Sequence, residues 1–530
     1  MLLLSLFLLT LNIAFIGKLR PFNSDDLYWQ QVVQTWRPFS HHTLYLATKD
    51  TFVEEAPFFW LMGHLFGSSR RLLMAESGIL TLSSFVLFYV STLYFLRKLK
   101  VQLTYPVLLP FAWLASFGYP LVQNYLNSDW RTFEVGLSFL TFLLTAAICN
   151  GDFKPRSSVW SKVLSVLSIL LIGVVIYSDP YYLIFTIGPI VLFTGLLYLL
   201  KRIDRKLVMT VYGGVVLSFL FGKIVGVILQ KAGVLVVTDT LSSFVNFDNI
   251  VVNIVESLHG MLIVFGADFF GHPTYQFTTF GYLVNAIVLG YILYKAYGIL
   301  RTPRSDLKKL SLPQLWMGFF GALVAFVFII YTSSSLVSVG NYRYFILLVY
   351  GAVAFLSLVL AVSRSLNLKL IISTLLVAAT LFNIGYTLFG NTIKTQPDVT
   401  GNIDNGLNLE IIRTVEGLGL TKGYASYWQG NVNTYLSGEK VTFLPIICWP
   451  AAQTNPFDWL VDGGQYNQPT KQTFYLMDPD WKAPPTCTLQ ALTKQFGKPE
   501  KTISISDKLL LVYNYDIVTK MPKRNTPAWY

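Results

Sequence analysis

Long apolar runs recur along most of this 530-residue chain and are separated by short polar loops. Runs of roughly 18 to 20 apolar residues match the hydrocarbon thickness of a bilayer, where α-helices satisfy their own backbone hydrogen bonds. The chain is 53% hydrophobic and only 13% charged, which agrees with this pattern. We predict a polytopic α-helical membrane protein with about 11 transmembrane helices. The predicted spans lie near residues 1–16, 77–96, 103–118, 133–149, 163–178, 182–200, 207–230, 280–299, 313–331, 344–362 and 370–388.

Two apolar segments need a separate interpretation. No basic stretch precedes the first segment and no small-residue cleavage site follows it, so we expect a retained helix and not a signal peptide. The segment near 251–267 carries Glu256 and His259 at its centre. Because a charged side chain is costly at the bilayer midplane, we expect this segment to be interfacial or re-entrant.

Basic residues predict the orientation. The net charge of +12 gathers in short clusters between apolar runs, as in "KRIDRK" (201–206) and "RTPRSDLKK" (301–309). This is typical of cytoplasmic loops near anionic lipid and not of a nucleic-acid groove. We therefore expect a multi-pass cell-membrane protein with these loops in the cytoplasm and no nucleic-acid partner. The segments expected outside are 17–76, 119–131, 178–181, 231–279, 332–343 and the C-terminal region.

The character of the chain changes after residue 390. A polar linker follows, and the segments 423–446 and 502–518 alternate like strands around "ICWPAAQTNPFDWL" and "TLQALTKQF". We predict a transmembrane domain over 1–390, with a long first outer loop at 17–76, and a small extracytoplasmic α/β domain over 391–530. Cys448 and Cys487 both fall in the second domain, where a disulfide and two free thiols remain open alternatives.

Two adjacent acids follow the first apolar segment. In "NSDDLYW", Asp25 and Asp26 stand at the start of a predicted interfacial helix. They can serve there as first-turn acids that favour the helix dipole. Alternatively, one of them is a general base for a hydroxyl, its pKa raised by its like-charged neighbour or by desolvation.

The same outer loop also contains histidines and further acids. A His-His pair and a Glu-Glu pair suggest a metal site as one hypothesis, but their spacing fits no compact metal motif, and we predict no metal. The sequence shows no P-loop, GxGxxG or HExxH pattern, and we expect no cofactor. The residues in question are His41, His42, Glu54 and Glu55.

Further polar groups stand at the other outer turns. "NSDWRTFE" places Asp129, Arg131 and Glu134 before a span, either as a salt-bridged helix end or as contacts to sugar and phosphate. "YSDPYY" places Asp179 in a short turn, where capping of the turn is the alternative to substrate binding.

A basic and aromatic element opens a late span. "NYRYF" places Arg343 between Tyr342 and another tyrosine. Arg343 either reaches toward the membrane surface or binds a lipid-linked phosphate through paired hydrogen bonds. All of these polar groups fall on one predicted membrane face, where the head group of a lipid lies.

With "SDD" after the first helix, "SDWRTFE", "SDPYY", "NYRYF" and an outer C-terminal domain, the chain resembles a bacterial GT-C-type glycosyltransferase. The resemblance implies a GT-C-like fold and an inverting enzyme that uses a polyprenyl-phosphate sugar as donor. It implies Asp25 or Asp26 as catalytic, Arg343 and Arg131 on the donor phosphate, and further substrate contacts from Asp129, Glu134, Asp179 and Tyr342. The acceptor is then a cell-wall polymer, a glycolipid or a protein. A transporter or flippase of lipid-linked glycans and a non-catalytic scaffold remain the alternatives.

Overall fold

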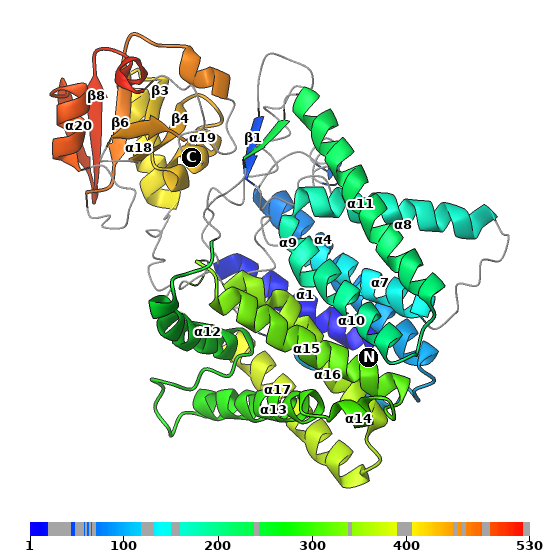
Figure 1. Ribbon diagram of the computed structural model, residues 1–530. Helices are drawn as coiled ribbons and strands as arrows, with labels where there is room; N and C mark the ends of the chain where they lie inside the picture. The colour runs from blue at the N-terminus through cyan, green and yellow to red at the C-terminus, as the bar shows by residue number, and fades with distance from the viewer. Residues whose placement is uncertain are drawn as a thin grey trace.

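The computed structural model is mainly helical, with a small sheet in its C-terminal part (Figure 1). The structure describes residues 1–19, 44–47, 58, 61–62, 65, 70–117, 132–149, 159–232, 234–237, 243–335, 337, 342–389, 405–448, 453–457, 463–479 and 488–522.

The long helices of the first 390 residues coincide with the predicted apolar segments. They are α1 (Leu2–Leu19), α4 (Arg70–Lys98), α5 (Tyr105–Ala115), α7 (Thr132–Cys149), α8 (Val159–Ser178), α10 (Gly188–Leu199), α11 (Arg205–Lys231), α12 (Ile250–Val264), α13 (Phe277–Leu300), α15 (Leu312–Thr332), α16 (Ile346–Val362) and α17 (Leu366–Phe389). Short elements complete this part: α9 (Pro180–Tyr182), α14 (Arg304–Leu307), the π-helix η2 (Leu183–Ile187), the 3-10 helices η3 (Phe247–Asn249) and η4 (Tyr342–Phe345), and the strands β1 (Leu44–Ala47) and β2 (Val234–Val237).

Six helices in the described part of the chain are long and apolar enough to cross a membrane. The other apolar helices offer only 10–17 residues with described side chains, and α5 has 11 residues in all. At about 1.5 Å per residue, a helix of that length does not cover a hydrocarbon core of about 30 Å. Each predicted segment is therefore an apolar helix, while a crossing at all of them stays a prediction.

Helix α16 lies at the centre of the helical part (Figure 1). Every residue from Ile346 to Leu360 is buried, as expected for a helix that is apolar on all sides. Around it, the ring of Phe88 lies 4.5 Å from that of Phe139 and 4.7 Å from that of Tyr350, in edge-to-face contacts. Aromatic packing of this kind stabilises the centre of the bundle beyond simple burial.

Helices α8 and α11 approach each other unusually closely. A Cβ on Gly173 would lie 2.5 Å from the carbonyl oxygen of Ser218, and one on Gly222 would lie 2.6 Å from the carbonyl oxygen of Gly173. Small residues allow such backbone contact between membrane helices. The contact fixes the direction of α8, which ends at the predicted outer turn.

Segments that were predicted to share a membrane face contact each other. The two basic loops meet where the Arg202 guanidinium donates a 2.8 Å hydrogen bond to the backbone carbonyl of Lys308. Two loops that were predicted to be outer pair through β1 and β2, which form a parallel ladder with Leu44 opposite Val234. These contacts agree with the alternation of loops that the basic residues predicted.

Helix α12 contains the segment predicted to be interfacial or re-entrant. It is one continuous helix and, together with η3, qualifies by length and composition as a candidate span. Asn253 donates to the carbonyl of Thr332 at the end of α15, and Gly260 packs against Tyr342 in η4. Both halves of α12 thus contact the segment between α15 and α16, and its interfacial or re-entrant position stays a prediction.

The C-terminal part contains a six-stranded sheet in the order β5-β4-β3-β6-β8-β7. Strands β3, β4 and β6 are parallel, and the remaining pairs are antiparallel. The strands are β3 (Lys422–Ala425), β4 (Thr442–Cys448), β5 (Thr454–Pro456), β6 (Thr473–Met477), β7 (Lys501–Ile505) and β8 (Lys508–Tyr513). The helices are α18 (Asn405–Gly417), α19 (Tyr427–Leu436), α20 (Leu489–Phe496) and the 3-10 helices η5 (Gly463–Asn467) and η6 (Ile517–Lys520).

Each face of this sheet is covered by helices. Tyr424 and Leu511 belong to a cluster with Leu492 of α20, whereas Phe443 and Leu510 belong to a cluster with Ile411 of α18. The sheet and its covering helices are the small α/β unit that the alternation predicted.

The strand prediction over 423–446 is wrong in its middle. Residues Tyr427–Leu436 form helix α19, with Ser426 as its N-cap residue. Gly430 lets this helix approach the sheet, because a Cβ there would lie 3.0 Å from the carbonyl oxygen of Phe443. Tertiary contact with β4 therefore overrides the local alternation.

Candidate functional site

The structure describes only some of the predicted site residues. Glu134, Asp179 and Tyr342 have described positions, and Arg343 is described by its backbone as part of η4. The other predicted site residues lie outside the described ranges: Asp25, Asp26, Asp129 and Arg131. The histidines and acids of the metal hypothesis lie outside them as well: His41, His42, Glu54 and Glu55.

Asp179 links α8 to α9 through a tight turn. Its side chain is fully buried, and its Oδ1 accepts a 2.8 Å hydrogen bond from the backbone N–H of Tyr181. The backbone carbonyl of Asp179 accepts a 3.0 Å bond from the N–H of Tyr182. Asp179 therefore has the turn-capping role that was one of its two predicted roles. Its second predicted role, substrate binding, stays a prediction.

The chain continues from this turn into the π-helix η2. Single-turn π-helices are rare and often occur at functional sites. Here Thr186 of η2 lies beside α7, with its Oγ1 2.7 Å from the Oγ of Ser138. One turn before Ser138, Glu134 is buried in the first turn of α7. Helix α7, which follows "SDWR", is thus joined to η2, which follows the Asp179 turn.

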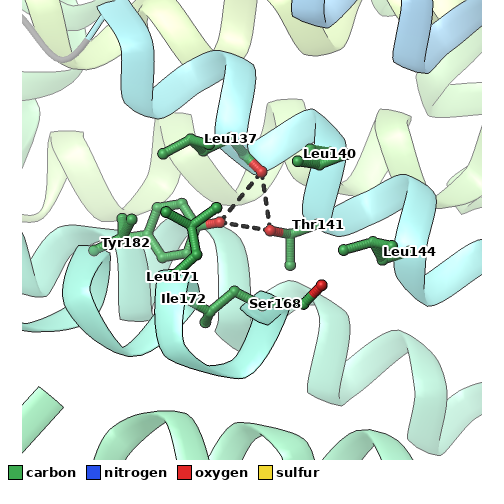
Figure 2. Close-up of a pocket in the computed structure, with 9 residues that line it drawn as sticks. Leu137, Leu140, Thr141, Leu144, Ser168, Leu171, Ile172 and Tyr182 are labelled. Atoms are coloured by element: carbon green, nitrogen blue, oxygen red, sulfur yellow. Dashed lines mark hydrogen bonds between the residues drawn. The ribbon is translucent and has the colours of Figure 1, made fainter. Parts of the chain in front are cut away.

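A second hydrogen bond joins α7 to the residues after the Asp179 turn, and it lies at the wall of a small hollow (Figure 2). The Tyr182 hydroxyl lies 2.7 Å from Thr141 Oγ1 and also donates to the carbonyl of Leu137 at 3.3 Å. The hollow is small and lies between α7 and α8. Its lining is mostly aliphatic: Leu137, Leu140, Thr141, Leu144, Ser168, Leu171, Ile172, Val175 and Tyr182. Among the described residues, none with a carboxylate or a basic group lines this hollow.

The "SDPYY" turn also contacts the "NYRYF" element. The rings of Tyr181 and Tyr344 lie 5.6 Å apart between centroids, and the ring of Tyr331 lies 5.9 Å from that of Tyr344. Tyr181 in turn stacks on Phe185 of η2 at 5.9 Å. Two motifs that the sequence separates widely therefore meet at the ends of α8 and α16.

Tyr342 packs on the other side of η4, against α12. A Cβ on Gly260 would lie 2.4 Å and 2.5 Å from the Cδ1 and Cε1 of the Tyr342 ring, so only glycine permits this contact. Burial raises the pKa of the Tyr342 phenol, and the negative charges of Glu256 and Asp268 raise it further. Tyr342 thus stays a neutral hydroxyl at physiological pH.

Sequence reasoning missed a polar pair close to Tyr342. His259, the residue before Gly260, has its Nε2 3.1 Å from Oδ2 of Asp268, whose charge acts on Tyr342. Glu256 and His259 stood out as polar residues in an apolar segment, but that signal pointed only to an interfacial position. Asp268 carried no signal, because it follows the segment in an ordinary polar loop.

The described residues thus bring together three elements that the sequence predicts at the outer face. These are the first half of α7, the Asp179 turn with η2, and η4. Within the described part of the chain no three His, Cys, Asp or Glu side chains lie close enough to hold a metal ion. Hydroxyls, phenols and the carboxyl groups of Glu134 and Asp179 lie here among apolar side chains such as Leu137 and Ile176, and such polar groups hydrogen-bond to polyols. Comparisons with protein-family models, with curated proteins and with solved structures find no match for this chain.

Proposed function

We propose that this protein is an inverting glycosyltransferase that moves a sugar from a polyprenyl-phosphate donor to an extracytoplasmic acceptor. The acceptor is a cell-wall polymer, a glycolipid or a protein. The contact between Tyr181 and Tyr344 supports this proposal most directly, because it joins two of the outer motifs at one place. The bonds between α7 and η2 add the helix that follows a third motif.

The proposed reaction uses the outer groups as follows. The oxygen of an acceptor hydroxyl attacks the anomeric carbon from the face opposite the phosphate, and its proton passes to Asp25 or Asp26. The bond between the anomeric carbon and the phosphate oxygen breaks, and its electron pair leaves with polyprenyl phosphate. Arg343 and Arg131 neutralise the charge on that leaving group. Asp129, Glu134, Asp179 and Tyr342 position the sugars.

The proposal includes a GT-C-like arrangement of about 11 crossings and an outer location for residues 391–530. A disulfide supports the outer location: Cys448 is disulfide-bonded, whereas Cys149 is free and buried, and the third cysteine, Cys487, lies outside the described residues. Disulfides persist mainly in oxidising compartments.

The location is tested in intact cells with a membrane-impermeant maleimide. We expect no labelling of Cys448 before reduction, and labelling after an impermeant reductant has opened its disulfide. Labelling that requires permeabilised cells would place this domain in the cytoplasm and contradict the proposal.

The activity is tested with the whole protein in lipid nanodiscs, using polyprenyl-phosphoryl hexose and pentose as donors and cell-envelope extract as acceptor. Whichever of Asp25 and Asp26 is the general base, its replacement by Asn should lower the transfer rate at least about 100-fold, the usual contribution of such a base. Asp248→Asn, at an exposed residue of η3, is the control and should keep the wild-type rate. Wild-type rates in both single variants and in the double variant would contradict the proposed role. Movement of the donor across the bilayer without a new glycosidic bond would indicate a flippase instead.

A further inference from the structure

A polar cluster lies where α12 and the loop after it meet η4. Its central contact joins His259 Nε2 to Asp268 Oδ2 at 3.1 Å. The side chains of His259 and Asp268 are 47% and 23% exposed, so a ligand has access to both. His259 lies near the C-terminal end of α12, and Asp268 lies in the following loop.

The loop that carries Asp268 is firmly held. The backbone N–H of Ala267 donates to the carbonyl of Leu262 at 2.7 Å, which closes the end of α12. The carbonyl of Gly266 accepts a 2.9 Å bond from Asn285 Nδ2 of α13. Gly266 has a φ of +60°, a backbone conformation that glycine adopts without strain. The Asp268 carboxylate is therefore presented on a preorganised backbone.

Several polar atoms of this region have no hydrogen-bond partner among the described residues. They are Asp268 Oδ1, the Tyr342 hydroxyl and Ser257 Oγ. Ser257 is fully buried and lies almost one helical turn before Gly260, on the buried face of α12. The Cδ1–Cε1 edge of the Tyr342 ring runs against Gly260 on the same face. Buried polar atoms are normally satisfied, so these atoms are suited to receive hydrogen bonds from, or donate them to, a bound group.

The charge of the region selects the kind of ligand. Glu256 and Asp268 both lie near enough to Tyr342 for their negative charges to act on its hydroxyl. Two carboxylates repel a phosphate but accept hydrogen bonds from neighbouring hydroxyl groups. Arg343, the next residue along η4, is the group proposed for the phosphate. A sugar linked to a phosphate suits such a site, with its hydroxyls near the carboxylates and its phosphate near Arg343.

We infer that His259, Asp268 and Tyr342 form a subsite for the sugar ring of the lipid-linked donor. The Asp268 carboxylate accepts hydrogen bonds from sugar hydroxyls, His259 orients that carboxylate, and the Tyr342 hydroxyl bonds to another sugar oxygen. This subsite rests on the proposed function, because it assumes a sugar attached to a phosphate beside Arg343. It adds residues that recognise the sugar separately from those that recognise the phosphate.

The test measures binding by the whole protein in nanodiscs. The probes are polyprenyl phosphate without a sugar and the same lipid carrying a hexose or a pentose. We expect the wild-type protein to bind one sugar conjugate at least about tenfold more tightly than the bare phosphate, which is the value of one good hydrogen bond to a charged group. Asp268→Asn should remove this advantage and leave the affinity for the bare phosphate unchanged.

Two milder variants keep the test decisive if Asp268→Asn folds poorly. Tyr342→Phe removes only the hydroxyl and keeps the ring on Gly260, and His259→Gln removes the imidazole but keeps a hydrogen-bond donor. Each should lower the affinity for the sugar conjugate severalfold, with no change for the bare phosphate. Asp248→Asn, an exposed acid in η3 before α12, is the matched control and should change neither affinity.

Three results would overturn the inference, and they are distinguishable. Equal binding of bare and sugar-bearing lipid by the wild-type protein would show that no sugar subsite exists, while leaving the phosphate site intact. Equal weakening of both lipids in the folded variants would show that the cluster has only a structural role. Failure of the wild-type protein to bind any of the lipids would contradict the proposed function itself and, with it, the subsite.

Discussion

The indole Nε1 of Trp113 donates a 2.8 Å hydrogen bond to Oδ1 of Asn285, which lies 172 residues further along the chain. The Nδ2 of Asn285 in turn donates to the carbonyl of Gly266 and to Oδ1 of Asn383, each at 2.9 Å. Asn383 donates to Ser116 Oγ at 3.1 Å. One amide therefore connects α5, α13 and α17 to the loop that carries Asp268.

We predict that Asn285→Leu destabilises the helical part of the protein. The change leaves the buried Trp113 indole N–H without its acceptor and Asn383 Oδ1 without its donor, which costs about 1–3 kcal/mol. The thermal unfolding midpoint of the purified protein in detergent should fall by several degrees. Asn246→Ala, at an exposed asparagine without a side-chain cap bond, should leave the midpoint unchanged. Equal midpoints for both variants would show that the network adds no stability.

The ring contact between Tyr181 and Tyr344 predicts energetic coupling between two motifs. Tyr181→Ala and Tyr344→Ala should each slow sugar transfer, and the double variant should be less impaired than the sum of the two effects. The coupling expected for an aromatic pair is about 0.5–1.5 kcal/mol. Transfer rates of the two single variants and the double variant measure it. Strictly additive effects would show that the two motifs act independently.

A buried ion pair at the end of β3 predicts a large effect in the C-terminal domain. Lys422 Nζ lies 3.2 Å from Asp516 Oδ2, and the Tyr424 hydroxyl donates to Asp516 Oδ1 at 2.6 Å. Asp516→Asn leaves the Lys422 charge buried without a counter-charge, so we expect a loss of about 3–5 kcal/mol. Urea unfolding of residues 391–530, expressed alone, measures this loss. The exposed Glu410→Gln of α18 is the control, and an equally small change in both variants would contradict the prediction.

The phenol of Tyr513 predicts a loss of stability in alkali. Burial, followed by the nearby Tyr515, raises its pKa from 10.0 to about 12. The folded domain thus favours the protonated phenol, so this stabilisation is complete below pH 10 and is lost as the pH rises toward 12. The free energy of unfolding of residues 391–530 should fall over that range, and more gently in Tyr513→Phe. Identical slopes for the wild-type and variant domains would show that Tyr513 does not contribute.

Hydropathy predicts the helices because burial in a bilayer requires an unbroken apolar surface. Helix α16 is the clearest case, since it is buried all round and its sequence is uniformly apolar. The contact between "SDPYY" and "NYRYF" agrees with hydropathy as well, because the alternation of the predicted helices puts both motifs on one predicted membrane face. The parts that sequence reasoning missed depend on contacts between distant segments. Helix α19 forms against β4, and Asp268 gains its partner His259 only when the chain reverses after α12.

The most direct measurement is an experimental structure of the protein with a non-hydrolysable polyprenyl-phosphate-sugar analogue bound. We expect the phosphate beside Arg343, the sugar against Tyr342 and Asp268, and Asp25 or Asp26 within hydrogen-bond reach of the attacking hydroxyl. The Tyr181–Tyr344 pair should border the same pocket. An analogue bound at the opposite end of the bundle, near the basic loop of Arg202, would contradict the proposal.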